Sequence, residues 1–351
     1  MKQLVRALVA AGLVIGALAV ASPASAAYSS PRFWVDMPTE RQSTGAPFRI
    51  NFRAAIEDDA TFRVQIYVPQ GYVTSLVPQA GQNIGTAAAV INATAIAAEA
   101  QVPVTGNIVG DTYAPDRYPQ GAACTGSPQI AGVWLLQLTA AGQTLTVPMY
   151  VETITAGPLA DRFSGRLTAC LPSPYPEAGP ARAQLGAKLL SASLSIRNVF
   201  TNPTAGGAYR WSALMTPWTP NSGVPNPTGT VEVQSIDRLP AQVVLTAAPN
   251  HRRNTVTFRG RVSENRVAVA GAAVQILRGV RVIRTVRTNA RGNFATTVRL
   301  RPGRYTFRAR AIVAVRNVDD CVQQFAPVPC IRATASGYRL LNNRAIRLRL
   351  R

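Results

Sequence analysis

The chain has 351 residues, with 37 lysines and arginines against 16 aspartates and glutamates, for a formal net charge of +21. The excess lies at one end, since residues 240–351 contain 22 arginines, no lysine and three acids, whereas residues 27–239 are balanced. A single histidine, His251, and the lack of a Cys-x-x-Cys pair exclude the common zinc sites and histidine-rich metal centres. We therefore predict no metal and no cofactor.

Residues 1–26 are typical of a secretory signal peptide. Lys2 and Arg6 precede an apolar stretch over 7–21, and the small residues 24–26 follow it. The apolar stretch is shorter than the ~20 helical residues that span a bilayer. We expect cleavage after Ala26 and an extracellular protein, either secreted or associated with the cell envelope.

The region 27–239 predicts a β-rich N-terminal domain. Runs of β-branched and aromatic residues bounded by glycine, proline and asparagine predict strands, and they lie at 63–68, 132–138, 144–151 and 191–200. The alanine-rich stretch 85–100 is the one helix candidate, although its β-branched residues lower helix propensity. We expect a β sandwich, or two small ones in contact, with one short helix.

A domain boundary is predicted near Leu239. The turn-forming residues 226–229 and the strand-like residues 231–233 close the first domain. Residues 236–240 are typical of a short linker, and the charge balance changes at the same place. The second domain is therefore predicted to be 240–351 and to fold alone.

Residues 240–351 predict an immunoglobulin-like sandwich. Apolar and polar residues alternate with a period of two around Phe258, Phe294, Phe307 and Leu348, as in half-buried strands. Turn residues at 289–293 and 301–303 separate the runs. About seven short strands in some 110 residues is the size and spacing of such a sandwich.

Four short motifs in this region resemble those of carboxypeptidase-regulatory-like and bacterial Ig-like modules. They are Val256-x-Phe258-x-Gly260-x-Val262, Val269-Ala270-Gly271-Ala272-x-Val274, Thr288-Asn289-x-x-Gly292-x-Phe294 and Leu300-x-Pro302-Gly303-x-Tyr305. The resemblance covers about 60 residues and departs from the family at Asn289, where aspartate is more common, and in its basicity. It implies a prealbumin-like sandwich that serves as a spacer, adhesion unit or carbohydrate binder, and no catalytic activity. The N-terminal region is similar in character to actinobacterial secreted proteins of unassigned function.

The four cysteines are predicted to form two disulfides. Cysteines of exported proteins usually pair, and three connectivities are open to four of them. Their positions in the sequence favour Cys124 with Cys170 in the first domain and Cys321 with Cys330 in the second.

Residues that could carry catalysis are few. His251 lies in a polar turn beside two arginines, so a solvated role is expected for it. The acids 57–59 are consecutive and predict an acidic turn, with a calcium site as the alternative. Glu99, Asp111 and Asp116 have no spacing that marks a glycosidase pair. We predict no catalytic residue and a protein that is not an enzyme, with a cryptic hydrolase as one alternative.

A second alternative is a carbohydrate-binding module. Tyr209, Trp211 and Trp218 fall within ten residues in a stretch rich in proline, glycine and asparagine, where exposed rings could stack on sugars. Large aromatic residues more often fill cores.

The arginines carry the main functional prediction. The guanidinium fork binds phosphate or carboxylate with two hydrogen bonds, and no sequence-specific nucleic-acid-binding motif is present. We predict an exported binding or adhesion protein that associates with an acidic cell-envelope polymer or an anionic lipid surface. The predicted contact residues are Arg259, Arg261, Arg299, Arg301, Arg304, Arg308, Arg310, Arg347, Arg349 and Arg351. The five arginines from Arg299 to Arg310 are expected on one face, because neighbouring strands in a sandwich usually pair.

Overall fold

The computed structural model describes residues 27–37, 45, 47–93, 100–140, 142–175, 187–318, 320–342 and 344–351. Strands are the dominant element of these residues, at 60% against 3% helix, which confirms the predicted all-β class. Across this described part of the chain, no helix has the length and apolar character needed to cross a membrane. The signal-peptide prediction, the cleavage site and Glu99 lie outside the described residues.

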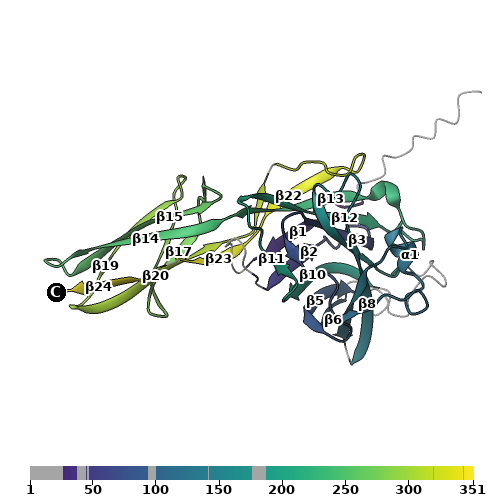
Figure 1. Cartoon of the computed structure of the whole chain (residues 1–351), viewed down its shortest axis with the longest axis horizontal. Helices are drawn as coiled ribbons and strands as arrows, with labels where there is room; N and C mark the ends of the chain where they lie inside the picture. The colour runs from purple at the N-terminus through teal and green to yellow at the C-terminus, as the bar shows by residue number, and fades with distance from the viewer. Residues whose placement is uncertain are drawn as a thin grey trace, which may run out of the picture.

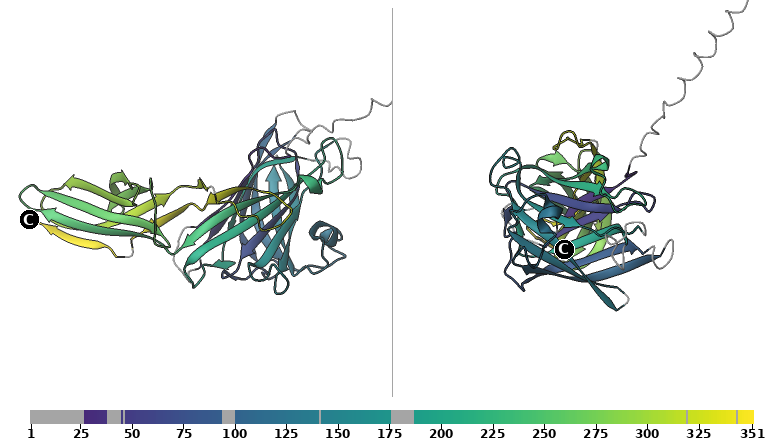
Figure 2. Two further views of the ribbon diagram at one scale, coloured as in Figure 1. Left: turned by 90° about the horizontal axis from the view of Figure 1, so that it is seen from above. Right: turned by 90° about the vertical axis from the view of Figure 1, so that its right-hand side faces the viewer.

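Two bodies follow one another along the long axis of the molecule (Figure 1). The larger body holds the N-terminal strands, and a narrow sandwich projects from it. The C-terminus lies at the far tip of the sandwich, and the view from above shows the same elongated arrangement (Figure 2). The sandwich therefore has most of its surface away from the first body.

One large sheet builds the first body. Its strands pair in the order β1 (Arg32–Asp36), β2 (Phe48–Arg53), β10 (Lys188–Ile196), β5 (Asn83–Asn92), β6 (Gln101–Asp111), β7 (Gly132–Ala140), β8 (Gln143–Thr153), β9 (Phe163–Cys170), β3 (Thr61–Pro69), β12 (Gly207–Pro217), β13 (Val231–Leu239), β22 (Cys330–Ala335) and β21 (Arg316–Val318). The short strands β4 (Val73–Thr74) and β11 (Phe200–Thr201) pair with each other, and a 3-10 turn covers Pro227–Gly229.

The sheet rolls so that its first strand returns to its eleventh. The backbone N–H of Val35 in β1 donates to Ser235 Oγ in β13 at 2.9 Å, and Met37 N–H donates to the Gly337 carbonyl at 3.2 Å. The inward side chains form one apolar core. Its largest fully buried members include Phe33, Phe48, Trp134, Phe200 and Trp211.

The helix prediction for 85–100 is wrong for residues 85–92, and residues 94–99 lie outside the described part of the chain. Residues 83–92 form strand β5, which pairs with β6 on one side and β10 on the other. Pairing on both edges satisfies the backbone of these residues, and this tertiary gain outweighs the helix propensity of alanine. The short helix of the first body is instead α1 (Gly121–Thr125), beside the first disulfide.

The second body is a sandwich of two sheets. The four-stranded sheet contains β14 (Ala241–Asn250), β15 (Thr255–Glu264), β16 (Val267–Ala268) and β19 (Asn293–Arg299). The five-stranded sheet contains β18 (Arg281–Arg287), β17 (Ala273–Arg278), β20 (Gly303–Val313), β23 (Tyr338–Leu341) and β24 (Ile346–Leu350).

The predicted alternation places the core of this sandwich correctly. Val256, Phe258 and Val262 of β15 are fully buried, and the Phe258 ring meets the Phe307 ring edge-on at 4.9 Å between centroids. Both aromatic rings belong to one apolar core that the two sheets share.

The junction consists of three chain crossings, not the single linker predicted at 236–240. Residues 231–239 are one strand, β13, and Pro240 leads directly into β14. After β20 the chain returns to the first body, where β22 pairs in parallel with β13, and it then re-enters the sandwich at β23. A boundary at Leu239 therefore marks the first crossing, while residues 316–335 belong to the sheet of the first body.

Buried polar groups fasten this return segment, which we define as residues 316–336. Glu232 of β13 is fully buried and accepts hydrogen bonds from Ser212 Oγ, Gln234 Nε2 and the backbone N–H of Gln324. The Phe325 ring stacks on Phe163 at 5.7 Å between centroids. The return segment is thus held by contacts that residues 240–351 do not contain.

We expect the fragment 240–351 to keep its sandwich but lose the structure of the return segment. Ala333 and Ala335 are buried against β13, so their amides should lose protection from hydrogen exchange when β13 is absent. A second fragment, in which a short glycine linker replaces 316–336, should keep protection throughout its sandwich, because Val315 and Gly337 lie in contact. Native-like protection at Ala333 in the fragment 240–351 would contradict this account.

Candidate functional site

The outward face of the five-stranded sheet gathers most of the sandwich's strand arginines. Alternate residues of β20 point outward, as do their cross-strand partners on β17, β23 and β24. We call this surface the basic face, and its arginines are Arg287, Arg304, Arg308, Arg310, Arg339, Arg347 and Arg349. All are exposed except Arg310, which is half-buried and donates to Gln275 Oε1.

Like charges lie directly opposite one another on the basic face. Arg304 of β20 lies directly opposite Arg349 of β24. Arg347 lies on the same side of β24 and is opposite Thr306. Directly opposite like charges repel and lower the stability of a sheet. Within the described residues, no ion pair involves an arginine of the basic face. The face is therefore a set of uncompensated cations on one side of a single sheet.

The described carboxylates of residues 240–351 lie at the junction between the two bodies. Glu264 is 5% exposed, accepts a hydrogen bond from the Tyr338 hydroxyl at 2.5 Å and pairs with Arg316 at 3.3 Å. Asp320 pairs with Arg210 and Arg238 of the first body. The compensated pairs thus lie at the junction, whereas Arg304, Arg347 and Arg349 lie toward the tip, where the chain ends. Arg287 and Arg339 lie at the base of the sandwich, level with Ile312 of β20.

The expected single face for Arg299 to Arg310 is wrong. β19, which carries Arg299, pairs with β15, whereas β20 pairs with β17, β23 and β24. The turn at Arg301 thus carries the chain from one sheet to the other, so Arg299 lies on the opposite side of the sandwich from Arg304 and Arg308. Arg351 lies at the tip, where its backbone N–H donates to His251 Nδ1 at 3.0 Å.

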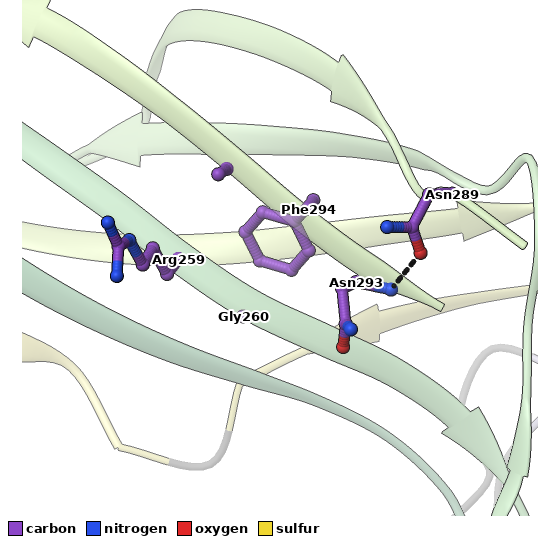
Figure 3. A pocket seen from close by; sticks show the side chains of 6 residues that line it. Arg259, Gly260, Asn289, Asn293 and Phe294 are labelled. Atoms are coloured by element: carbon purple, nitrogen blue, oxygen red, sulfur yellow. Dashed lines mark hydrogen bonds between the residues drawn. The ribbon is translucent and has the colours of Figure 1, made fainter. Parts of the chain in front are cut away.

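The four-stranded sheet carries fewer arginines among small residues. Arg259, Arg261 and Arg299 share its outward face, which we call the back face, with alanines and threonines. A surface depression of about 360 Å³ lies there, lined by Arg259, Asn289, Asn293 and the Phe294 ring (Figure 3). Gly260 makes room for this ring, because a Cβ at that position would lie 2.4 Å from it.

Asn289 orders the turn beside this depression. Its Oδ1 accepts hydrogen bonds from the N–H groups of Arg291 at 2.9 Å and Asn293 at 3.0 Å, the second of which is drawn in Figure 3. An aspartate, the more common residue in the modules that this region resembles, would accept the same two bonds. The departure at Asn289 therefore preserves the turn.

Both predicted disulfides are present. Cys124 pairs with Cys170 in the first body, and Cys321 pairs with Cys330 in the return segment. The second disulfide therefore closes a loop that packs on the first body, not one within the sandwich.

The prediction that Tyr209, Trp211 and Trp218 stack on sugars is wrong. Trp211 is fully buried and Trp218 is 6% exposed, so neither ring offers a face to a sugar. Tyr209 is half-buried, its ring meets Tyr72 edge-on, and its hydroxyl donates to the Ala205 carbonyl. These aromatic residues fill the core of the first body because β12 directs Trp211 inward.

The acidic groups named from the sequence have structural contacts. Asp58 is 4% exposed and accepts hydrogen bonds from the N–H groups of Ser29 and Ala55 and from Ser29 Oγ, which makes it the organiser of a turn. Hydrogen bonding by the Tyr118 hydroxyl, with Thr112 N–H and Arg117, holds the pKa of Asp111 below its usual value. Within the described ranges, no group of three histidines, cysteines or acids could hold a metal.

Comparison with known proteins finds no matching family model and no matching curated protein. One solved structure, described as dimeric latent PorU from Porphyromonas gingivalis, is 11% identical and has a TM-score of 0.16. The alignment covers 89% of this chain and 34% of that one. The resemblance of 256–305 to carboxypeptidase-regulatory-like modules therefore stays a prediction.

Sequence reasoning missed two arginines of the basic face. Arg339 lies between the inward Tyr338 and Leu340, so the alternation along β23 was a signal that could have found it. Arg287 lies at the end of β18 opposite Ala273, and its place on this face follows from a cross-strand register that the sequence does not display.

Proposed function

We propose that this protein is an exported, non-enzymatic binding protein whose basic face docks on an acidic polymer of the cell envelope. The observation that carries the proposal is the basic face itself, with seven arginines on the outward side of one five-stranded sheet. Their mutual repulsion lowers stability, so a bound polyanion would neutralise a cost that the folded protein otherwise carries.

The shape of the molecule supports the same function. The sandwich projects from the first body (Figure 1), and Arg304, Arg347 and Arg349 of the basic face lie on the half of it that is farther from the carboxylates at the junction. Three chain crossings hold the sandwich to the first body. We propose that binding of the basic face keeps the first body at the envelope in a fixed orientation. Export itself rests on residues 1–26 and is consistent with the two disulfides.

The test of this function is a salt titration of binding to two immobilised polymers, poly(glycerol phosphate) and neutral dextran. Binding to the phosphate polymer should fall steeply as salt rises, because docking releases the counterions of each neutralised phosphate. Dextran should bind weakly at every salt concentration. Equal binding to both polymers, or binding to the phosphate polymer that does not change with salt, would contradict the proposal.

A further inference from the structure

A cavity of about 100 Å³ lies inside the first body, between the strands of the rolled sheet. The side chains that line it come from strands on both sides of the roll and are all apolar. They include Phe33, Ile66, Ala87, Leu136, Met149 and Ala169. None belongs to the basic face, so the cavity is independent of the function proposed above.

Small residues create this space. Ala87 of β5 and Ala169 of β9 point into the interior and are 4% and 6% exposed. Elsewhere in the same core, the rings of Phe48, Phe200 and Trp211 contact one another. Protein interiors are normally close-packed, and an empty cavity lowers stability. The core thus has a filled aromatic part and an underfilled alanine-lined part.

The chemistry of the lining selects the occupant. A buried water needs two to four polar partners, and apolar cavities of roughly this size stay dry and take up small apolar molecules. Among the lining residues no side chain can donate or accept a hydrogen bond to such a water. A ligand for this cavity must therefore be a hydrocarbon.

The shape of the lining favours a chain over a compact molecule. Along β10 the lining residues run from Leu189 through Ala192 to Leu194, and the space between them, about 100 Å³, takes only the last few carbons of a chain. Leu171 and Leu189 line the cavity and are half-buried, and we place the entrance beside them. Leu145, which is 39% exposed, lies opposite the lining residue Leu138 and adds apolar surface to the outside of the roll.

We propose that the first body binds the end of an unbranched hydrocarbon chain, the acyl chain of a lipid, which enters beside Leu171 and Leu189 and lies against Ala87 and Ala169. Filling the cavity with ligand restores the apolar contacts that the alanines omit. The acyl chain would give the first body a binding role distinct from that of the sandwich.

The probe is cis-parinaric acid, a fatty acid that fluoresces when its chain is buried, titrated into the whole protein. The parent should give a saturable fluorescence increase that palmitate displaces. Ala87→Leu and Ala169→Leu should each weaken binding at least tenfold without lowering the unfolding temperature, because the added side chain occupies the cavity. The matched control is Thr86→Val, since Thr86 lies on the same strand but is exposed.

Three results of the parinarate titration would contradict the proposal. Absence of a saturable signal in the parent, uptake of benzene without uptake of parinarate, or unchanged binding in the folded leucine variants would overturn the proposal. If both leucine variants fail to fold, Met149→Ala decides, since it enlarges the cavity and should tighten parinarate binding at least threefold. Unchanged affinity in that variant would overturn the proposal equally.

Discussion

Replacing Trp211 with alanine should lower the free energy of unfolding by about 3–5 kcal/mol, the usual cost of deleting a fully buried large aromatic side chain. The Trp211 ring is fully buried and contacts the rings of Phe48, Tyr72 and Phe200, at 5.1 to 6.3 Å between centroids. Removing it leaves a cavity among three aromatic groups that come from separate segments of the chain. Urea unfolding monitored by circular dichroism measures the loss.

Two further variants give this measurement its controls. Trp211→Phe should cost much less, because Trp211 Nε1 makes no hydrogen bond to the described residues and phenylalanine keeps most of the apolar volume. Val224→Ala changes a side chain that is 62% exposed and should alter stability by less than about 0.5 kcal/mol. If Trp211→Ala left stability unchanged but removed binding to a polysaccharide, the ring would be a surface platform and the carbohydrate-binding alternative would return.

The second large effect is expected on the basic face. Changing Arg304, Arg308, Arg347 and Arg349 together to glutamine should weaken binding to a phosphate polymer on the order of 100-fold at low salt. The slope of log K against log salt should become shallower by about 3, since four phosphate contacts are lost. These side chains are exposed and point outward, so the core remains intact.

The same variant should unfold at an equal or higher temperature than the parent. Arg304 and Arg349 lie directly opposite one another, and replacing them with glutamine removes a like-charge contact. Weaker binding together with undiminished stability would mark arginines that serve binding at the expense of stability. A clear fall in the unfolding temperature would instead show that the arginines support the sandwich through their aliphatic stems.

The alternation of apolar and polar residues was enough to predict the strands of the sandwich and their inward side chains. Val256, Phe258 and Val262 are buried as expected, because a two-residue period is a local property of a strand. The two disulfides were also predictable, since the cysteines of a protein expected to be exported usually pair and their sequence separation favours these two pairs.

Strand pairing was not predictable, because it is non-local. β19 and β20 are adjacent in sequence but join different sheets, which moved Arg299 away from Arg304. The position of the return segment could not be predicted for the same reason, since β22 pairs with β13 about a hundred residues earlier in the chain. Strand β5 was predicted as a helix for another reason. Ala87, Ala88 and Ala89 have high helix propensity, and their run shows no hydrophobic period that would indicate a strand.

The most direct measurement of the central claim compares two fourfold variants of equal charge for their retention on isolated cell envelopes. One carries glutamine at Arg304, Arg308, Arg347 and Arg349 of the basic face. The other carries glutamine at Arg259, Arg261 and Arg299 of the back face and at Arg291 in its adjoining turn. Both lose four positive charges, so they differ in where the charge is removed. We predict that the basic-face variant is released at low salt while the back-face variant is retained as the parent is. Equal release of the two variants, or retention of both, would contradict the account.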